Sequence, residues 1–160
     1  MKKIQQAFIL TFVLFASTFS YTSTVMLEED VDDFTDEVSY MLMIADDTGE
    51  GIFGAICNNS AFAFLIMPDG MWSAESYLNV QFRFDRDEPY TERMVVSDYN
   101  GVMTNDVSTA MNIFRNARDA DSFVVKVGPE DTQRFSALSS KDRTKVDRFF
   151  KLTSSIYACS

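Results

Sequence analysis

A series of short apolar runs, each closed by turn residues, constrains this chain more than any other feature of its sequence. The runs are Val38–Ala45, Ile52–Cys57 and Ala61–Met67, and Asp-Asp-Thr-Gly at 46–49 and Asn-Asn-Ser at 58–60 separate them. Apolar runs of about four to eight residues that are bounded by turn residues are typical of β-strands. The Asn-Asn-Ser sequence between two such runs predicts a hairpin.

The next segment, Tyr77 to Asp85, has the clearest strand pattern. Its apolar residues Leu78, Val80, Phe82 and Phe84 alternate with polar ones, which is the period of a strand buried on one face. The segment from Glu92 to Ser97 follows a short turn and predicts the return strand. Because the predicted strands are consecutive and their connections are short, they favour an antiparallel meander.

Two helices and two further strands are predicted in the second half of the chain. Apolar residues recur at helical spacing over residues 107–117, after Thr104 or Asn105 as the N-cap, and over residues 146–157, after Ser140 as the N-cap. Ser122–Val127 and the alternating residues 133–137 predict strands between these helices. The predicted fold class is therefore α+β: an antiparallel meander or sandwich-like sheet with two helices.

The first twenty residues have the composition of a secretory signal peptide. Lys2 and Lys3 precede the apolar run Ala7–Phe15, and small residues follow up to Ser20. The run is about half as long as a membrane-spanning helix requires, and an uncleaved N-terminal anchor is the alternative interpretation. We therefore predict a signal peptide at 1–20, an acidic, mostly solvated lead-in at 21–37, and a single α+β domain at 38–160. The predicted location is the periplasm, with the extracellular space as the alternative.

The charges are strongly asymmetric along the chain. The formal net charge is −10, and no Lys or Arg occurs between Ile4 and Phe82. An acidic protein is repelled by nucleic acid and by anionic membrane surfaces. The charge therefore predicts a partner that is another envelope protein, in particular a basic one, with no nucleic acid and no stable membrane insertion after cleavage. Solubility alone is the simpler explanation of this charge.

Cys57 and Cys159 are the only two cysteines. In an exported protein an even number of cysteines is typical of disulfide pairing, and two free buried thiols are the alternative. A bond between them closes a loop of about 100 residues, for which loop entropy gives about 4–5 kcal/mol as an upper value. Such a bond would attach the last helix to the sheet.

The composition excludes several kinds of catalytic site. The chain contains no histidine, which removes histidine-based triads and zinc sites. No pattern indicates a catalytic residue, a metal ligand or a cofactor, and the segment Asp46–Glu50 fits a hairpin turn better than a calcium loop. A glycan hydrolase that uses a pair of carboxylates is a remaining alternative. Met71 and Trp72 form a candidate partner-binding loop, with partial burial of Trp72 at the core edge as the alternative. Arg83 and Asp85, the charged residues of the alternating strand, are the other candidates.

Several of these segments occur in an order that resembles the TagO/VasI-like family of periplasmic proteins associated with bacterial type VI secretion. The matching features are Asp33-Phe34-Thr35-Asp36, Cys57-Asn58-Asn59, Val80-Gln81-Phe82-Arg83-Phe84-Asp85, Ser97, Lys126 and Cys159. The resemblance covers residues 33–159 and implies a structural disulfide and an accessory or binding role without catalysis. The chain lacks an aromatic ending after Cys159, so a phage-encoded envelope protein of the same fold is an alternative.

The sequence thus predicts a non-enzymatic accessory or binding protein of the periplasm. Association with type VI secretion or another envelope assembly follows from the resemblance. An acidic inhibitor of a basic envelope-targeting enzyme, such as a lysozyme, is the second hypothesis and rests on the net charge.

Overall fold

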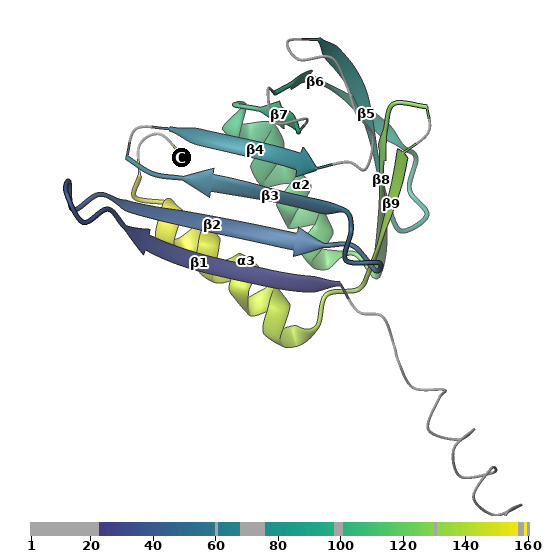
Figure 1. The fold of residues 1–160 in the computed structure, drawn as a ribbon. Helices are drawn as coiled ribbons and strands as arrows, with labels where there is room; N and C mark the ends of the chain where they lie inside the picture. The colour runs from purple at the N-terminus through teal and green to yellow at the C-terminus, as the bar shows by residue number, and fades with distance from the viewer. Residues whose placement is uncertain are drawn as a thin grey trace, which may run out of the picture.

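The computed structural model describes residues 23–59, 61–67, 76–97, 101–129, 131–156 and 159. They form one open antiparallel sheet of nine strands with two helices on one of its faces (Figure 1). The predicted α+β class is therefore confirmed. The predicted signal peptide at 1–20 lies outside the described residues.

The first four strands form a meander. They are β1 (Thr24–Val31), β2 (Val38–Ala45), β3 (Ile52–Cys57) and β4 (Phe62–Met67). Both predicted turns are present: Asp46 Oδ1 accepts hydrogen bonds from the Thr48 and Gly49 N–H groups, and Asn58 Oδ1 accepts one from the Ala61 N–H group. Gly49 has a φ of 79°, a backbone conformation that glycine adopts without a steric cost. Local turn chemistry therefore sets the register of this half of the sheet.

The acidic segment predicted as a lead-in before the domain contains strand β1, so the predicted domain boundary at residue 38 is wrong. All eight residues of β1 pair with β2, from Thr24 opposite Ala45 to Val31 opposite Val38. Only Val25 of this strand is fully buried, so its side chains are largely solvated as predicted. An edge strand needs few buried residues because its backbone pairing supplies much of its order, and its charges prevent pairing with other chains.

The remaining strands do not continue the meander in chain order. They are β5 (Tyr77–Phe84), β6 (Tyr90–Val96), β7 (Val102–Thr104), β8 (Ser122–Val127) and β9 (Asp131–Ser136). The order across the sheet is β1-β2-β3-β4-β7-β6-β5-β8-β9, so β4 neighbours β7 rather than β5. Strand β7 was missed because three residues are too few for a recognisable alternation.

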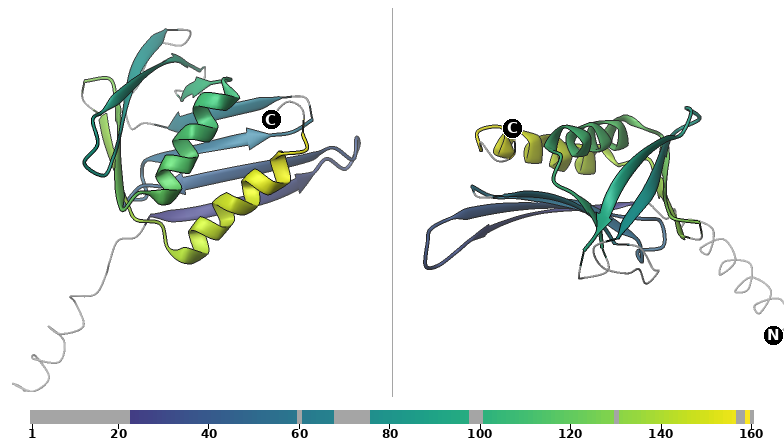
Figure 2. Two further views of the ribbon diagram at one scale, coloured as in Figure 1. Left: turned by 180° about the vertical axis from the view of Figure 1, so that it is seen from behind. Right: turned by 90° about the horizontal axis from the view of Figure 1, so that it is seen from above.

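The sheet bends sharply where β7 joins its two halves. Strands β1–β4 run crosswise to β5, β8 and β9, and the helices lie in the angle between the halves (Figures 1 and 2). Only two residue pairs connect β7 to β6, Val95 with Met103 and Val96 with Val102. So narrow a connection permits a large change of strand direction, because few ladder hydrogen bonds resist the twist.

The two helices cover the inner face of the sheet. Helix α2 (Val107–Asp119) begins at the N-cap Asp106, whose side chain accepts a hydrogen bond from Thr109, and helix α3 (Ser140–Thr153) begins at the N-cap Ser139. Both caps differ from the predicted residues by one or two positions. Lys145 Nζ on α3 donates to the Val25 carbonyl oxygen of β1 and lies 2.8 Å from Asp142 Oδ1, which attaches this helix to the sheet edge.

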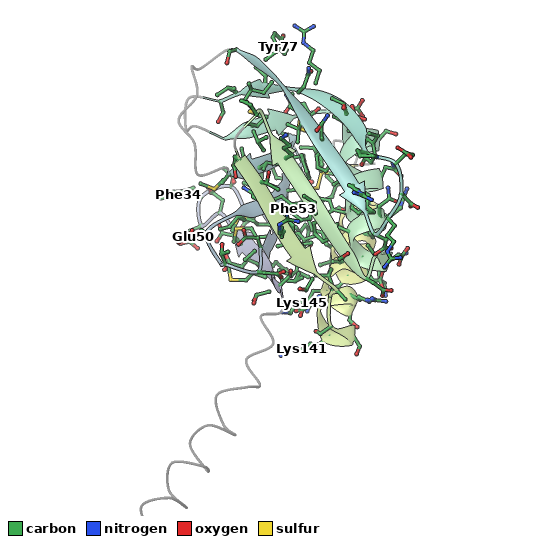
Figure 3. The ribbon with its side chains drawn as sticks, turned by 90° about the vertical axis from the view of Figure 1, so that its right-hand side faces the viewer. Phe34, Glu50, Phe53, Tyr77, Lys141 and Lys145 are labelled. Atoms are coloured by element: carbon green, nitrogen blue, oxygen red, sulfur yellow. A yellow bond between two sulfur atoms is a disulfide. The ribbon has the colours of Figure 1, made fainter. Side chains whose placement is uncertain are left out.

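Phenylalanines fill the angle between the two halves. Phe53 of β3, which is fully buried, lies 5.3 Å from the ring of Phe114 on α2 and 5.2 Å from Phe135 on β9. Phe123 and Phe135 stack at 4.3 Å, and Figure 3 shows Phe53 in the interior. Stacked and edge-to-face contacts of this kind contribute about 0.5–1.5 kcal/mol beyond area burial. The core therefore joins both sheet halves and a helix around one side chain.

Cys57 and Cys159 form the predicted disulfide, with 6.0 Å between their Cα atoms. Helix α3 ends at Thr153, so the prediction that the helix itself carries Cys159 is wrong. The N–H of Cys159 donates to the Ile156 carbonyl oxygen in a turn after the helix. The bond still links β3 to the segment that follows α3 across 102 positions.

We predict that reduction of this disulfide lowers the free energy of unfolding by up to about 4–5 kcal/mol. The bond closes a long loop and so restricts the entropy of the unfolded chain, and reduction removes this restriction. Urea unfolding with and without a reducing agent measures the difference. The Cys57→Ser, Cys159→Ser double variant serves as the control, because a reducing agent should leave its unfolding midpoint unchanged. A wild-type midpoint that does not move on reduction would contradict the prediction.

Candidate functional site

The outer face of the sheet, opposite the helices, carries a continuous row of apolar side chains across seven strands. The residues of this row lie directly opposite one another on successive strands: Met26, Met43, Gly54, Leu65, Met103, Val95 and Tyr77. Side chains opposite one another in adjacent strands share a face of the sheet. Tyr77 ends the row and is 61% exposed; its position at one end of the molecule is visible in Figure 3.

Two further rows extend this apolar face on β2, β3 and β4, and on β1 these rows end at the polar residues Glu28 and Thr24. They pair Met41 with Ile56, Ile56 with Ala63, and Ile52 with Met67. Met26, Ile56 and Met67 are 46%, 45% and 45% exposed, among the largest exposures of apolar side chains in the described residues. We call the side chains of these three rows on β1–β4 and β7 the apolar platform. A contiguous exposed apolar patch of this kind is typical of an interaction site.

Methionine dominates the platform. Five of the nine methionines lie on it: Met26, Met41, Met43, Met67 and Met103. The flexible, polarisable methionine side chain adapts to differently shaped partners, and surfaces that bind proteins use it for this reason. Gly54 lies among these residues because a Cβ there would meet the Leu42 carbonyl oxygen at 2.6 Å.

Four basic side chains lie on the same outer face beyond the bend. They are Arg83 on β5, Arg93 on β6, Lys126 on β8 and Arg134 on β9, and we call them the basic strip. The register places them outward, since Arg83 and Arg134 both lie opposite Val124, and their strand neighbours Phe82 and Phe135 are buried. None of the four forms an ion pair with another residue in the described part of the chain. The Arg93 guanidinium lies 4.3 Å from the Tyr77 ring, which connects the strip to the end of the apolar row.

The predicted partner-binding residues have different positions in the structure. Arg83 belongs to the basic strip. Asp85 has a φ of 50° just after β5, and its Oδ1 atom accepts hydrogen bonds of 2.8 and 2.9 Å from the N–H groups of Asp121 and Ser122. Its carboxylate therefore connects the end of β5 to the start of β8. Met71 and Trp72 lie outside the described residues.

A concave site of a different kind lies at the end of the β5–β6 hairpin. This acidic groove has a volume of about 300 Å³ and is lined by Phe84, Asp85, Asp87, Glu88, Tyr90, Asn116, Asp119 and Ala120. Two of its carboxylates are already engaged, since Asp85 accepts the backbone bonds above and Asp119 lies 2.7 Å from Arg118. The Arg118 guanidinium holds the pKa of Asp119 below its usual value. All four carboxylate residues of the groove are exposed, and Asp87 and Glu88 are the two that form no ion pair within the described residues and do not hold the β8 backbone.

Within the described residues no group of three or more His, Cys, Asp or Glu side chains could hold a metal ion, and no helix has the length and apolarity to cross a bilayer. Comparison with known proteins adds no relative, since no protein-family model, curated protein or solved structure matches this chain.

Sequence reasoning missed the apolar platform, although its signal is present. The runs Met41-Leu42-Met43-Ile44 and Phe62-Ala63-Phe64-Leu65-Ile66-Met67 do not alternate, unlike Tyr77–Phe84. Continuous apolar strands are typical of a sheet that is covered on both faces. Here both described helices cover one face only (Figure 2), and on the other face Met26, Ile56 and Met67 are almost half exposed.

We predict a pH dependence from Tyr90, whose ring stacks 5.5 Å from Phe82. Burial raises the pKa of Tyr90 from 10.0 to about 12, and the Glu92 carboxylate adds to this shift. The folded state therefore favours the neutral phenol, and this stabilisation is complete below pH 10.0 and is lost as the pH rises towards 12. Urea unfolding at neutral pH and at about pH 11 measures the effect. Between these two pH values the free energy of unfolding should fall more in the wild type than in Tyr90→Phe. Equal losses in the two proteins would refute the assignment.

Proposed function

We propose that this protein is a non-enzymatic binding protein of the bacterial cell envelope, which docks another envelope protein on the outer face of its sheet. The observation that carries the proposal is the apolar platform, since Met26, Ile56 and Met67 are each almost half exposed within one contiguous apolar surface. Leaving such an area in water is unfavourable by about 25 cal/mol per Å². A partner that covers it recovers this free energy.

The chemistry of the surface defines the partner. The apolar platform requires an apolar patch on the partner, and the adjoining cations Arg83, Arg93, Lys126 and Arg134 favour acidic side chains beside that patch. The net charge of −10 by itself favours a basic partner. Charges farther than about 10 Å from the contact are screened at 0.1 M salt, however, so the local cations have more influence on docking.

The location in the envelope is part of the proposal. It is supported by the N-terminal sequence, whose charge and apolar run are typical of a signal peptide, and by the Cys57–Cys159 disulfide, because such bonds persist in oxidising compartments. The resemblance to the periplasmic TagO/VasI-like proteins supports an accessory role, either in type VI secretion or in another envelope assembly.

We predict that Met26→Glu with Ile56→Glu weakens partner binding by at least about 30-fold, because charges within an apolar interface remove hot-spot contacts. A photo-crosslinker at Met43 should capture one defined envelope protein, and titration of that purified protein measures the affinity. The double variant Asn112→Glu with Thr144→Glu adds the same two charges to exposed positions on the helices and should bind normally. Equal effects of the two double variants, or no capture through Met43, would overturn the proposal.

A second candidate is inhibition of a basic envelope-targeting enzyme such as a lysozyme, and the acidic groove favours it. A basic protrusion can enter that groove and meet the carboxylates of Asp87 and Glu88. We expect inhibition of a lysozyme to be lost in Asp87→Asn with Glu88→Gln and kept in Glu50→Gln, which removes a charge elsewhere. Unchanged muramidase activity of several lysozymes with added wild-type protein would exclude this candidate.

A further inference from the structure

A groove of about 360 Å³ separates helices α2 and α3 on the side of the molecule away from the apolar platform. Its lining residues come from the first half of α2, the end of α3 and the disulfide: Val107, Ser108, Met111, Arg115, Phe150, Thr153, Ser154 and Cys159. The volume lies at the lower end of the range of small-molecule sites. The apolar side chains of Val107, Met111 and Phe150 and the hydroxyl groups of Ser108, Thr153 and Ser154 share this lining.

Among the described residues of this lining, Arg115 is the only one with a charged side chain. Its guanidinium carbon lies 5.7 Å from the centre of the Phe150 ring, so the cation is held against the apolar wall. No carboxylate in the described part of the chain forms an ion pair with it. Arg118, one turn later on the same helix, is paired at 2.7 Å with Asp119 and at 2.8 Å with Asp147. The two arginines therefore differ in that only Arg115 is available to an external anion.

Helix α3, which forms one wall of the groove, carries an excess of cations, in contrast to the acidic chain as a whole. Helix α3 carries five cations, Lys141, Arg143, Lys145, Arg148 and Lys151, against two anions, Asp142 and Asp147. Figure 3 shows Lys141 and Lys145 on this helix, on the side away from Phe34 and Glu50. An electropositive surface concentrates anions near the groove.

We propose that this groove binds a small apolar carboxylate of the medium-chain fatty acid class, with its carboxylate on Arg115 and its chain against Met111 and Phe150. A guanidinium and a carboxylate form charge-assisted hydrogen bonds, while Val107, Met111 and Phe150 supply the apolar walls. The Thr153 hydroxyl donates its hydrogen bond to the Phe149 carbonyl oxygen at 2.9 Å. It therefore does not compete with Arg115 as a donor to the ligand carboxylate. Because Cys159 lines the groove, the site depends on its bond to Cys57.

Decanoate is a suitable probe, and its binding to the full-length mature protein can be measured by calorimetry and by NMR shift changes. We expect Arg115→Gln to weaken decanoate binding at least about ten-fold, since it removes the bonds to the charged head group. Arg118→Gln changes the same residue type one turn away, outside the groove lining, and should bind decanoate as the wild type does. Decanol, which has the same chain without the charge, should bind the wild type and Arg115→Gln equally weakly.

The largest shift changes should fall on Val107, Ser108 and Met111, and reduction of the disulfide should abolish them. Three results would overturn the proposal. They are shift changes on the apolar platform instead of the groove, binding of decyltrimethylammonium as tight as that of decanoate, and an equal loss of decanoate affinity in the Arg115→Gln and Arg118→Gln variants. No decanoate binding at millimolar concentration would also overturn it. Because the platform variants Met26→Glu and Ile56→Glu leave this groove intact, failure here and failure of the proposed docking function are separate results.

Discussion

The aromatic contacts around Phe53 are the constraint on which the rest of this structure depends. This side chain lies on β3 in the first half of the sheet, yet it meets Phe123 and Phe135 of the second half at 5.4 and 5.2 Å and Phe114 of α2 at 5.3 Å. A flat sheet would separate these rings. The bend at β7 brings them together, and the burial of several phenylalanines offsets the backbone pairing that the bend removes.

The bend also explains why the two faces of the sheet differ. The inner, concave face is filled by phenylalanines and covered by α2 and α3, whereas the outer face has no described helix over it (Figure 2). The platform and the basic strip lie on either side of the bend on that outer face, and the Arg93–Tyr77 contact joins them. One partner with an apolar patch and an acidic margin can therefore contact both surfaces.

The disulfide and the polar contacts of α3 hold the helix layer in place. Lys145 attaches the helix to β1, and the Cys57–Cys159 bond attaches the segment after the helix to β3. At the opposite end of the sheet, Asp47 accepts hydrogen bonds from Ser23 and from Ser136, which ties the β2–β3 turn to β9. These contacts connect residues that are far apart in the sequence. They keep the two binding surfaces that we propose in fixed positions on opposite sides of the molecule.

The sequence by itself determined the elements whose signals are local. Alternation predicted β5, the turn residues at 46–49 and 58–60 predicted two hairpins, and two cysteines allowed only one intramolecular pairing. Only the tertiary structure decided the strand order β4-β7-β6-β5, the inclusion of β1 in the sheet and the surroundings of Arg83 and Arg115. Local patterns report backbone preference and one-sided burial within a few residues. Which strands become neighbours, and which apolar face stays uncovered, depends on packing between distant segments.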